Sequence, residues 1–305
     1  MSNTATVLAF DFGASSGRAI RAVYDGQNLN YEEIHRFENV PIEKDGHLCW
    51  DVETLLKEIH TAIQKAGTFD SLGFDTWGVD FGLLDADGHL LANPVHYRDA
   101  RTNGKPEQAA ACMPAEELYA HTGNQIMAIN TLFQLLALQE QEPELLQKAE
   151  QILFMPDLFA ALLGAEPVCE RSIASTSQML DPRTGQWSRE VLAAYGLNEN
   201  HFASLVASGT VTGTLTTSAK IIAVAGHDTQ CASAAMPCAE EDAEHTAFLS
   251  CGTWSLLGTE LDTPILTADS CQSGLSNELG ANGKINYLKN IIGLWLIQES
   301  RREYK

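Results

Sequence analysis

The sequence predicts a two-domain α/β protein with mixed sheets and helices on both faces. At 305 residues, 45% of them hydrophobic, the chain is long enough for about two domains with buried cores. Near its start a buried-strand run, VLAF (7–10), leads through a Gly/Ser loop to a second strand, RAIRAVY (18–24). Near its end, AFLSCGTWSLLG (247–258) repeats the order strand, Gly loop, strand. Helical patterns lie between these two units, which is typical of an α/β fold.

The first unit reads as a hairpin followed by a helix. Its first strand ends at Asp11 and Gly13, and its second strand reaches the turn dipeptide Asp25-Gly26. The apolar spacing after Asp51 then predicts an amphipathic helix, which Gly67 ends.

The middle of the chain predicts a long strand and then mainly helices. The strand is expected over 72–84, before a turn, and the texture is helical over 114–163, with Asn130 as a helix cap. A short buried strand is predicted at 221–226, followed by a tightly packed helix over 227–236.

The domain boundary is expected near 236–244, where Pro237 and the acidic run AEEDAEH interrupt the pattern. This divides the chain into an N-terminal domain, residues 1–238, and the start of a C-terminal domain, residues 239–305.

Composition limits the partners of the protein. The balance of 19 basic and 40 acidic residues gives a net charge of −21, which repels nucleic acid and anionic lipid and favours a small-molecule ligand. The seven cysteines are odd in number and form no Cys-x-x-Cys pair, so we expect reduced thiols. No basic residue precedes the first apolar run, and apolar stretches such as 291–297 are too short to span a bilayer. The predicted location is therefore cytoplasmic; the sequence does not indicate an oligomeric state.

The stretch FDFGASSGRAI (10–20) is rich in glycine and serine but matches neither common phosphate-loop pattern. It lacks the lysine of a P-loop, and it leads to a strand instead of the helix of a dinucleotide-binding fingerprint. What remains is a turn whose backbone N–H groups, with the hydroxyls of Ser15 and Ser16, can donate to phosphate oxygens. An ordinary Gly/Ser hairpin is the alternative, but the similar segment at 250–255 favours phosphate binding. Such a unit used twice is the arrangement of the actin-like ATPases.

Six motifs, in register along the chain, resemble those of the FGGY carbohydrate kinases. They are DFGASSGR (11–18), DTWGVDF (75–81), YRDARTNG (97–104), GHDT (226–229), SCGTWSL (250–256) and LKNIIGLWLIQ (288–298). The resemblance runs from about Val7 to the end of the chain and implies an actin-like ATPase (ribonuclease H-like) fold. It also implies that the second domain is incomplete here, because family members are longer and their additional part includes a glycine-rich segment that packs against adenine.

Asp228, in GHDT, is the candidate catalytic base. It follows a buried strand and starts a predicted helix, where the positive end of the helix dipole favours an ionised carboxylate. Such a carboxylate can orient a sugar hydroxyl and accept its proton. Taken alone, an aspartate at this position is more often a helix N-cap; the resemblance implies the catalytic role.

The resemblance also implies a sugar site formed by Gly78, His227, Asp228, Thr229 and Asn290. A glycine lets its backbone approach a ligand closely, and an amide both donates to and accepts from hydroxyls. Without the resemblance, a helix cap is an equal interpretation of Asn290, and a packed histidine is the commoner interpretation of His227.

Other residues in these motifs leave two interpretations open. Trp77 either stacks on a sugar or is simply buried. A loop that either reaches the sugar cleft or is solvated carries Arg98, Asp99 and Arg101. On an extended strand, Asp75 and Asp80 would face opposite sides, so they do not form an acid/base pair.

For the nucleotide, the resemblance implies ATP contacts from Ala14, Ser15, Ser16, Gly17, Arg18, Thr253 and Gln298. Arg18 can pair with phosphate oxygens, although a strand residue that faces water is the alternative. Asp11, at the end of the first strand, can hold Mg²⁺ through water, because this ion keeps several of its waters.

The sequence thus predicts an ATP- and Mg²⁺-dependent kinase that phosphorylates a ketose, and the resemblance implies the 1-hydroxyl of L-rhamnulose. Three alternatives stay open: a kinase for L-fuculose or another ketose, a catalytically silent sugar-binding or regulatory protein on the same scaffold, and an actin-like nucleotide switch that binds a protein partner.

Overall fold

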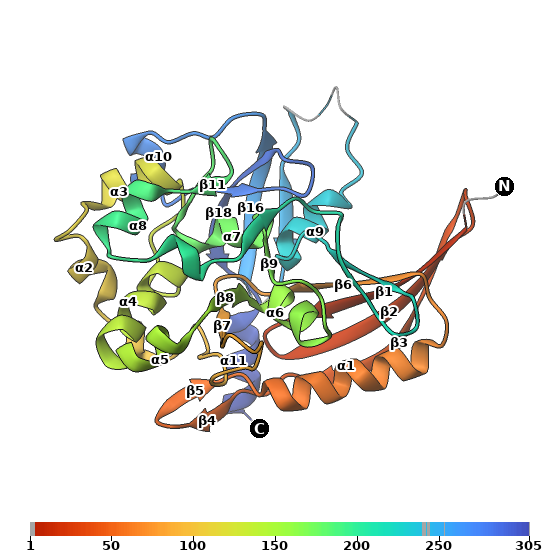
Figure 1. Cartoon of the computed structure of the whole chain (residues 1–305). Helices are drawn as coiled ribbons and strands as arrows, with labels where there is room; N and C mark the ends of the chain where they lie inside the picture. Colours follow the sequence, from red (N-terminus) through yellow and green to blue (C-terminus); the bar gives the residue numbers. More distant parts are fainter. Residues whose placement is uncertain (1–3, 240–241, 243–244, 253, 305) are drawn as a thin grey trace.

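The computed structural model describes residues 4–239, 242, 245–252 and 254–304. It contains a six-stranded mixed sheet near the start of the chain and a four-stranded antiparallel sheet near its end (Figure 1). A group of short helices lies to one side of both sheets, and four two-stranded pairs complete the fold (Figure 1). The predicted α/β class with mixed sheets is therefore confirmed.

The described strands have the following bounds: β1 (Ala5–Phe12), β2 (Ser16–Tyr24), β3 (Leu29–Glu38), β4 (Ile42–Lys44), β5 (His47–Cys49), β6 (Ser71–Thr76), β7 (Phe81–Leu84), β8 (Gln151–Phe154), β9 (Val168–Glu170), β10 (Leu180–Asp181), β11 (Gln186–Trp187), β12 (Ser204–Val206), β13 (Thr210–Thr214), β14 (Lys220–Ala223), β15 (Phe248–Cys251), β16 (Trp254–Leu261), β17 (Ser276–Leu279) and β18 (Ile285–Ile292).

The described helices have the following bounds: α1 (Val52–Ala66), α2 (Lys105–Ala109), α3 (Ala115–Thr122), α4 (Thr131–Gln141), α5 (Pro143–Lys148), α6 (Met155–Leu162), α7 (Arg171–Ala174), α8 (Arg189–Ala194), α9 (Asp228–Ala234), α10 (Ala268–Gln272) and α11 (Trp295–Glu303). Three short 3₁₀ turns are η1 (Ala100–Thr102), η2 (Ser175–Ser177) and η3 (Glu199–His201).

The six-stranded sheet has the order β13-β14-β6-β1-β2-β3. The β1–β2 and β2–β3 pairs are antiparallel hairpins, as the Gly/Ser loop and the Asp25-Gly26 turn predicted. In contrast, β6 is parallel to both β1 and β14. Because parallel strands end at the same edge of a sheet, the ends of β1, β6 and β14 lie together.

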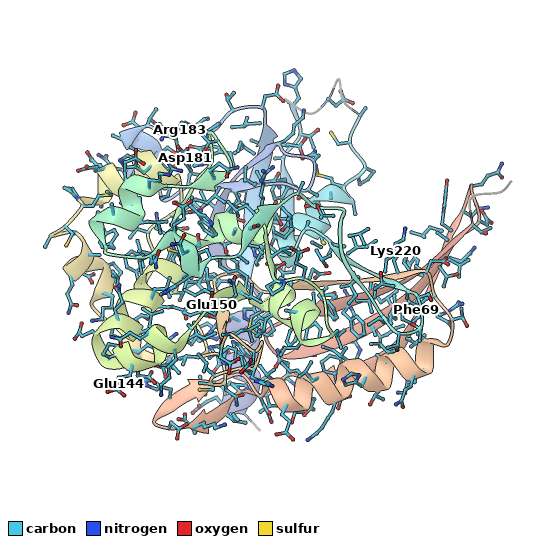
Figure 2. All side chains as sticks on the ribbon, in the orientation of Figure 1. Phe69, Glu144, Glu150, Asp181, Arg183 and Lys220 are labelled. Carbon is cyan, nitrogen blue, oxygen red and sulfur yellow. The ribbon has the colours of Figure 1, made fainter. Side chains whose placement is uncertain are left out.

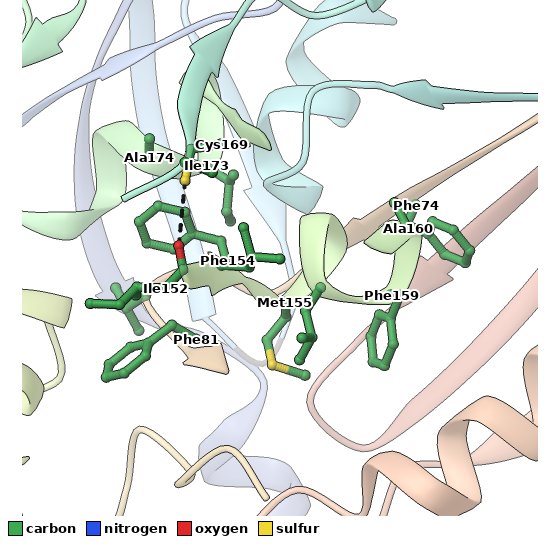
Figure 3. Close-up of a cluster of buried hydrophobic side chains, with 14 of the residues drawn as sticks. Phe74, Phe81, Ile152, Phe154, Met155, Phe159, Ala160, Cys169, Ile173 and Ala174 are labelled. Carbon is green, nitrogen blue, oxygen red and sulfur yellow. Dashed lines mark hydrogen bonds between the residues drawn. The ribbon is translucent and has the colours of Figure 1, made fainter. Parts of the chain in front are cut away.

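One face of this sheet forms the main hydrophobic core. Alternate residues of β1, namely Leu8, Phe10 and Phe12, are fully buried, as the period of two of a strand requires. The Phe12 ring stacks on Phe159 of α6 at 4.8 Å between ring centres, and α1 covers β2 and β3. Figure 3 shows the continuation of this core around Phe154. Elsewhere in the sheet, α9 lies against β6.

The second sheet has the order β15-β16-β18-β17, and all of its pairs are antiparallel. Its β15–β16 hairpin is the repeat that the sequence predicted. A small separate core under it contains Phe248, Leu256 and Leu288, whereas Leu279 and Ile285 belong to the main core. The second sheet is thus packed onto the first part of the chain, and the domain division at 238/239 stays a prediction.

Two predicted elements were wrong. The strand expected over 72–84 is two strands, β6 and β7, because Val79 has a left-handed backbone (φ +68°) that breaks the extended run. The helical stretch expected over 114–163 is interrupted by β8 (Gln151–Phe154), which pairs with β7. A short apolar run such as QILF is compatible with a buried strand as well as a helix, and here its pairing with β7 makes it a strand.

The surface carries the acidic excess and isolated ion pairs. Figure 2 shows Glu144 pointing away from the protein, and Arg183 donates to both carboxylate oxygens of Asp181 at 2.9 Å. All seven cysteines are free thiols, as expected. Among the described residues, no helix has the length and apolar character needed to cross a membrane.

The N-cap of α1 provides a test of how this helix is stabilised. The Asp51 carboxylate accepts hydrogen bonds from the Thr54 N–H at 3.2 Å and the Thr54 hydroxyl at 2.7 Å. We expect Asp51→Ala to lower the free energy of unfolding by about 1 kcal/mol, measured by urea denaturation. Asp51→Asn, which keeps an acceptor at this position, should lose less than half of that; an equal loss in both variants would contradict the capping role.

Candidate active site

A cavity of about 370 Å³ lies between the two sheets and is lined by both glycine hairpins. From the first sheet come Gly13 to Ser16, Trp77 and Gly78; from the second come Ser250, Gly252, Trp254 and Asn290. The GHDT segment contributes His227, Asp228 and Thr229. Most of the predicted site residues, which are far apart in the sequence, therefore meet in one cavity.

In each glycine hairpin the N–H of the glycine donates a hydrogen bond back into the hairpin. In the first, the Gly13 N–H donates to Ser16 O at 2.9 Å; in the second, the Gly252 N–H donates to Trp254 O at 2.9 Å. The first loop is held from outside by Asn39, which donates from its side chain to Gly13 O at 2.9 Å and from its backbone to Ser15 O at 3.1 Å. The loop is therefore fixed by its neighbours before any ligand binds.

Among the predicted ATP and Mg²⁺ contacts whose side chains the structure describes, three are not among the residues that line the cavity: Asp11, Gly17 and Arg18. Gly17 is required for packing, because a Cβ there would overlap the Phe37 ring. The Arg18 guanidinium forms an ion pair with Asp11 at 2.6 Å. Thr253 lies outside the described residues.

The position of Gln298 is described only by its backbone, which lies in α11. These nucleotide contacts stay predictions.

Asp228 is the first residue of α9, and His227 holds the N-cap position. The capping interpretation of Asp228 is therefore wrong. Among the described residues, its polar contacts all reach Oδ1: the Thr229 N–H at 2.6 Å, the Thr229 hydroxyl at 3.3 Å and His227 Nε2 at 3.3 Å. Removal from bulk water raises the pKa of Asp228, while His227 and the Thr229 N–H oppose this shift.

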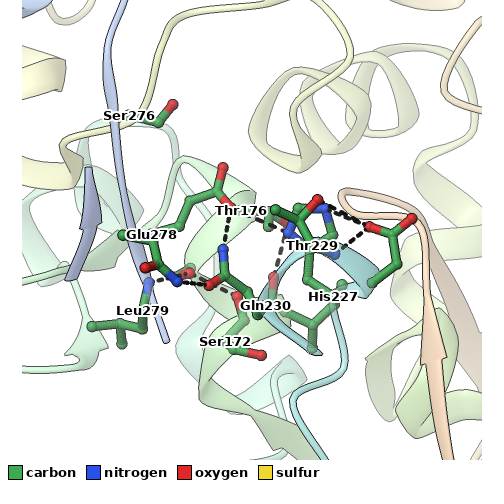
Figure 4. A network of polar contacts seen from close by, with 12 residues as sticks. Ser172, Thr176, His227, Thr229, Gln230, Ser276, Glu278 and Leu279 are labelled. Carbon is green, nitrogen blue, oxygen red and sulfur yellow. Dashed lines mark hydrogen bonds and ion pairs between the residues drawn. The ribbon is translucent and has the colours of Figure 1, made fainter. Parts of the chain in front are cut away.

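His227 bridges two carboxylates. Its Nδ1 lies 3.1 Å from Oε2 of Glu278, and its Nε2 faces Asp228 (Figure 4). Burial lowers the pKa of His227, but the hydrogen bond and charge of Glu278, together with the charge of Asp228, raise it above the usual value. Because a carboxylate lies near each ring nitrogen, the surroundings suit an N–H donor at both positions.

Gly78 and the strained Val79 form a sharp bend beside His227. A Cβ on Gly78 would lie 3.4 Å from His227 Nε2 and 3.3 Å from the Thr176 side chain, so the space there is already filled. The Val79 backbone is held by Thr176 Oγ1, which accepts from its N–H at 3.1 Å, and by Thr131 Oγ1, which donates to its carbonyl at 2.6 Å. A left-handed valine is costly, and these bonds maintain it.

Asp80 supports this bend from below. Its carboxylate accepts from Trp50 Nε1 at 2.6 Å, Trp77 Nε1 at 3.0 Å, the Tyr97 N–H at 3.2 Å and Gln134 Nε2 at 2.8 Å. Burial raises the pKa of Asp80 to about 6 even though these four donors oppose the shift, and the four donors suit a carboxylate at this position. Trp77 is 6% exposed and tied to Asp80, so its buried interpretation is confirmed, although its edge reaches the cavity. The premise that Asp75 and Asp80 share one extended strand was wrong, but they do not form a pair.

The 97–104 loop is mainly structural. Asp99 accepts from the Leu48 N–H at 2.8 Å and caps η1, and Arg101 donates to Gln134 Oε1 at 2.9 Å. Neither residue is among those that line the cavity in the described chain, and both are half-buried in a loop in which Arg98 and Asn103 are exposed. Arg98 is exposed and lies over the Tyr97 ring and, at 5.3 Å, over Trp295 of α11.

Asn290 lies in β18 and lines the cavity, so the helix-cap interpretation was wrong. Its amide is 3.4 Å from Gln125 Oε1 across the cavity. Three carboxyl groups converge near the hairpin: Asp11, Asp75 and Asp228. Burial and the charges of Asp11 and Asp228 raise the pKa of Asp75 well above its usual range.

Sequence reasoning missed several polar residues of the cavity wall, among them Asn124, Gln125, Thr176, Ser276 and Glu278. None of them lies in any of the six motifs that the sequence analysis singled out. The one available signal was the polar run RSIASTSQ (171–178), which is unusual between apolar segments and is buried here.

A family model for the N-terminal domain of the FGGY family of carbohydrate kinases matches residues 6–234. The chain therefore belongs to the FGGY family of carbohydrate kinases, and the resemblance found in its motifs is confirmed. The match ends four residues before the predicted domain boundary at 238.

The curated relatives to which the chain is similar include two rhamnulokinases. The rhamnulokinase of Bacteroides thetaiotaomicron is 42% identical over 307 residues, and that of Enterococcus faecalis is 40% identical over 312 residues. These matches cover 96% and 97% of this chain but 63% and 62% of the relatives, so the chain spans less than two thirds of their length. Among solved structures, the xylulose kinase from Lactobacillus acidophilus has a TM-score of 0.77 at 17% identity, covering 93% of this chain and 59% of that one. This likeness confirms the predicted actin-like fold.

The buried His96, whose neighbour Tyr97 lines the cavity, should make the free energy of unfolding depend on pH. It stacks on Trp50, its Nδ1 accepts from the Arg98 N–H at 2.9 Å, and burial, followed by the Arg98 charge, lowers its pKa to about 4. The unfolded state binds the His96 proton more tightly than the folded state does. The contribution of His96 to the free energy of unfolding is therefore fully present above pH 6.5 and is lost as the pH falls towards 4. We expect a loss of up to about 3 kcal/mol, measured by denaturant unfolding at a series of pH values. His96→Asn keeps an acceptor but does not titrate, so its loss over this range should be smaller; identical profiles would contradict the assignment.

Proposed function

We propose that this protein phosphorylates a ketose with ATP, and that the substrate is L-rhamnulose, which becomes L-rhamnulose 1-phosphate. The observation that carries the proposal is the single cavity in which both glycine hairpins face Asp228 and a set of hydroxyl-binding groups. Relatives about 40% identical are named rhamnulokinases, which supports this ketose over L-fuculose. We further propose that the protein acts in the cytoplasm.

The phosphates of ATP would lie between the hairpins. Backbone N–H groups from Ala14 to Ser16, with the two serine hydroxyls, are the donors at one end of the cavity, and Ser250 and Gly252 stand opposite. The loop is already held by Asn39, which lowers the ordering cost of binding. Gly17 supports it by making room for Phe37, and Arg18 offers a cation nearby.

The carboxyl groups at this edge suit a hard divalent cation. Asp11, Asp75 and Asp228 concentrate negative charge, which raises the pKa of Asp75 and is partly offset by Arg18. Mg²⁺ prefers oxygen ligands and retains its waters, so Asp11 is the residue proposed to hold it through water. ATP would supply the γ-phosphoryl group, and the ion would neutralise part of its charge.

The sugar would occupy the other end of the cavity. Gly78, His227, Thr229 and Asn290 are proposed to bind its hydroxyls. Asp228 would accept the proton of the 1-hydroxyl as the new oxygen–phosphorus bond forms, because its position favours a carboxylate fixed at Oδ1. Closure of the two proposed domains, 1–238 and 239–305, would exclude water from this reaction.

The assignment of the base is tested with Asp228→Asn, which keeps the shape of the side chain. We expect ketose-dependent ADP release to fall by about 10²- to 10⁴-fold, because an amide cannot accept the proton. The measurement is ADP release across a panel with L-rhamnulose, L-fuculose and L-ribulose. Turnover comparable with the unchanged protein would overturn the base, while ketose binding without turnover in the unchanged protein would favour the silent sugar-binding alternative.

The proposed metal position is tested with Asp11→Asn and chelation. Chelation of Mg²⁺ should abolish turnover, and Asp11→Asn should raise the Mg²⁺ concentration for half-maximal rate by roughly 10-fold. Asp25→Asn, at the outer turn of the same strands, is the matched control and should leave this concentration unchanged. An unaltered Mg²⁺ dependence in Asp11→Asn would place the ion on other groups.

A further inference from the structure

Glu278 is a buried carboxylate that the family match, which ends at residue 234, does not reach. It lies on β17 with only 5% of its surface exposed and contributes to the cavity wall. Its Oε2 accepts from Gln230 Nε2 at 2.8 Å and from His227 Nδ1 at 3.1 Å (Figure 4). A buried carboxylate is costly unless it is paired, so these contacts require an explanation.

The position of Glu278 is fixed on both sides. The next residue, Leu279, donates from its N–H to Ser175 Oγ at 2.9 Å, which anchors β17 to the first part of the chain. On the other side, Asn286 donates to Gln230 Oε1, which turns the Gln230 amide so that its NH₂ group points at Glu278. Glu278 therefore has little freedom to move away from His227.

The histidine transmits this constraint to Asp228. With a donor on Nδ1 directed at Glu278, the His227 ring plane is set, and Nε2 lies 3.3 Å from Asp228 Oδ1 as an ion-pair contact. The Thr229 N–H also donates to this oxygen, at 2.6 Å. The Thr229 hydrogen bond and the His227 ion-pair contact thus hold Oδ1, and among the described residues Oδ2 is the oxygen left to receive a proton.

The charges around His227 favour this arrangement. It is faced by Glu278 from β17, Asp228 from α9 and Glu170 from β9, all acidic, and the charge of Asp11 on β1 also reaches Asp228. Within the described part of the chain, Glu278 is the group that hydrogen-bonds Nδ1, so we infer that it decides both the ring orientation and the donor on that nitrogen.

We propose that Glu278 is a positioning residue for phosphoryl transfer: it holds His227 as a two-donor ring, so that Asp228 is fixed at Oδ1 and accepts the substrate proton at Oδ2. This inference rests on the proposed function, because it assigns a support to the proposed base. Under this proposal Glu278, which lies outside the matched domain 6–234, is needed to position Asp228, which lies inside it.

The test is a double-mutant cycle of Glu278→Gln and His227→Gln. Glu278→Gln should lower kcat for the ketose by about 10-fold or more, with a smaller change in KM, because misplacement of a base affects the chemical step. In the His227→Gln background, Glu278→Gln should change kcat less than about 2-fold, because the intermediary is missing. Glu260→Gln, on β16 of the same sheet and bonded to Asn282 instead, is the matched control and should keep the kcat of the unchanged protein. Additive losses in the cycle would overturn the proposal.

A second measurement does not depend on turnover. The ¹⁵N shifts of the His227 ring, identified by their loss in His227→Gln, should show both nitrogens protonated at pH 7 in the unchanged protein and one deprotonated in Glu278→Gln. A neutral ring in the unchanged protein would overturn the inference even if Glu278→Gln did not fold. If no ketose is phosphorylated, the proposed function fails, whereas the ring spectrum still decides whether Glu278 fixes His227.

Discussion

The parallel pairing of β6 with β1 and β14 is the constraint on which the site depends. It places Asp11 of β1 directly opposite Asp75 of β6. The Thr76 N–H donates to Gly226 O at 2.8 Å, which fixes the GHDT segment next to the end of β6. Because parallel strands end at one edge, the loop after β1, the bend after β6 and the helix after β14 all open into the same cavity. A change of strand order would separate these groups.

The same edge concentrates carboxylates, and the fold compensates for them with donors. Glu170 is 1% exposed, and its Oε2 accepts from the Gly226 N–H at 3.0 Å and from the Ser172 N–H at 3.0 Å. It therefore holds the turn that precedes His227. Asp80 has four donors of its own, and Asp11 has Arg18. Buried charges in such a network are tolerable because each is hydrogen-bonded, and the loss of one donor would leave another group unpaired.

The second sheet completes the cavity through contacts with the first part of the chain. Ser276 Oγ accepts from the Gln125 N–H at 2.9 Å, and Asn277 reaches Gly123 O at 3.1 Å, so β17 is bonded to the segment after α3. A Cβ on Gly123 would overlap Asn277, and this close approach explains the glycine. These contacts hold the sheet that brings Glu278 to His227 and Asn290 to the cavity wall.

The sequence by itself determined the features that depend on neighbouring residues. The two glycine hairpins, the capped helix after Asp51 and the strand–helix unit around GHDT all follow from local spacing and turn chemistry, and the structure has them. Only the tertiary structure decided the bend at Val79 and the strand β8, because partners more than fifty residues away stabilise them. It also decided the contact of Glu278 with His227, which no motif indicates. These two residues are fifty-one positions apart in the sequence and meet because β17 packs on the first part of the chain. Such long-range packing is not recorded in the local sequence pattern.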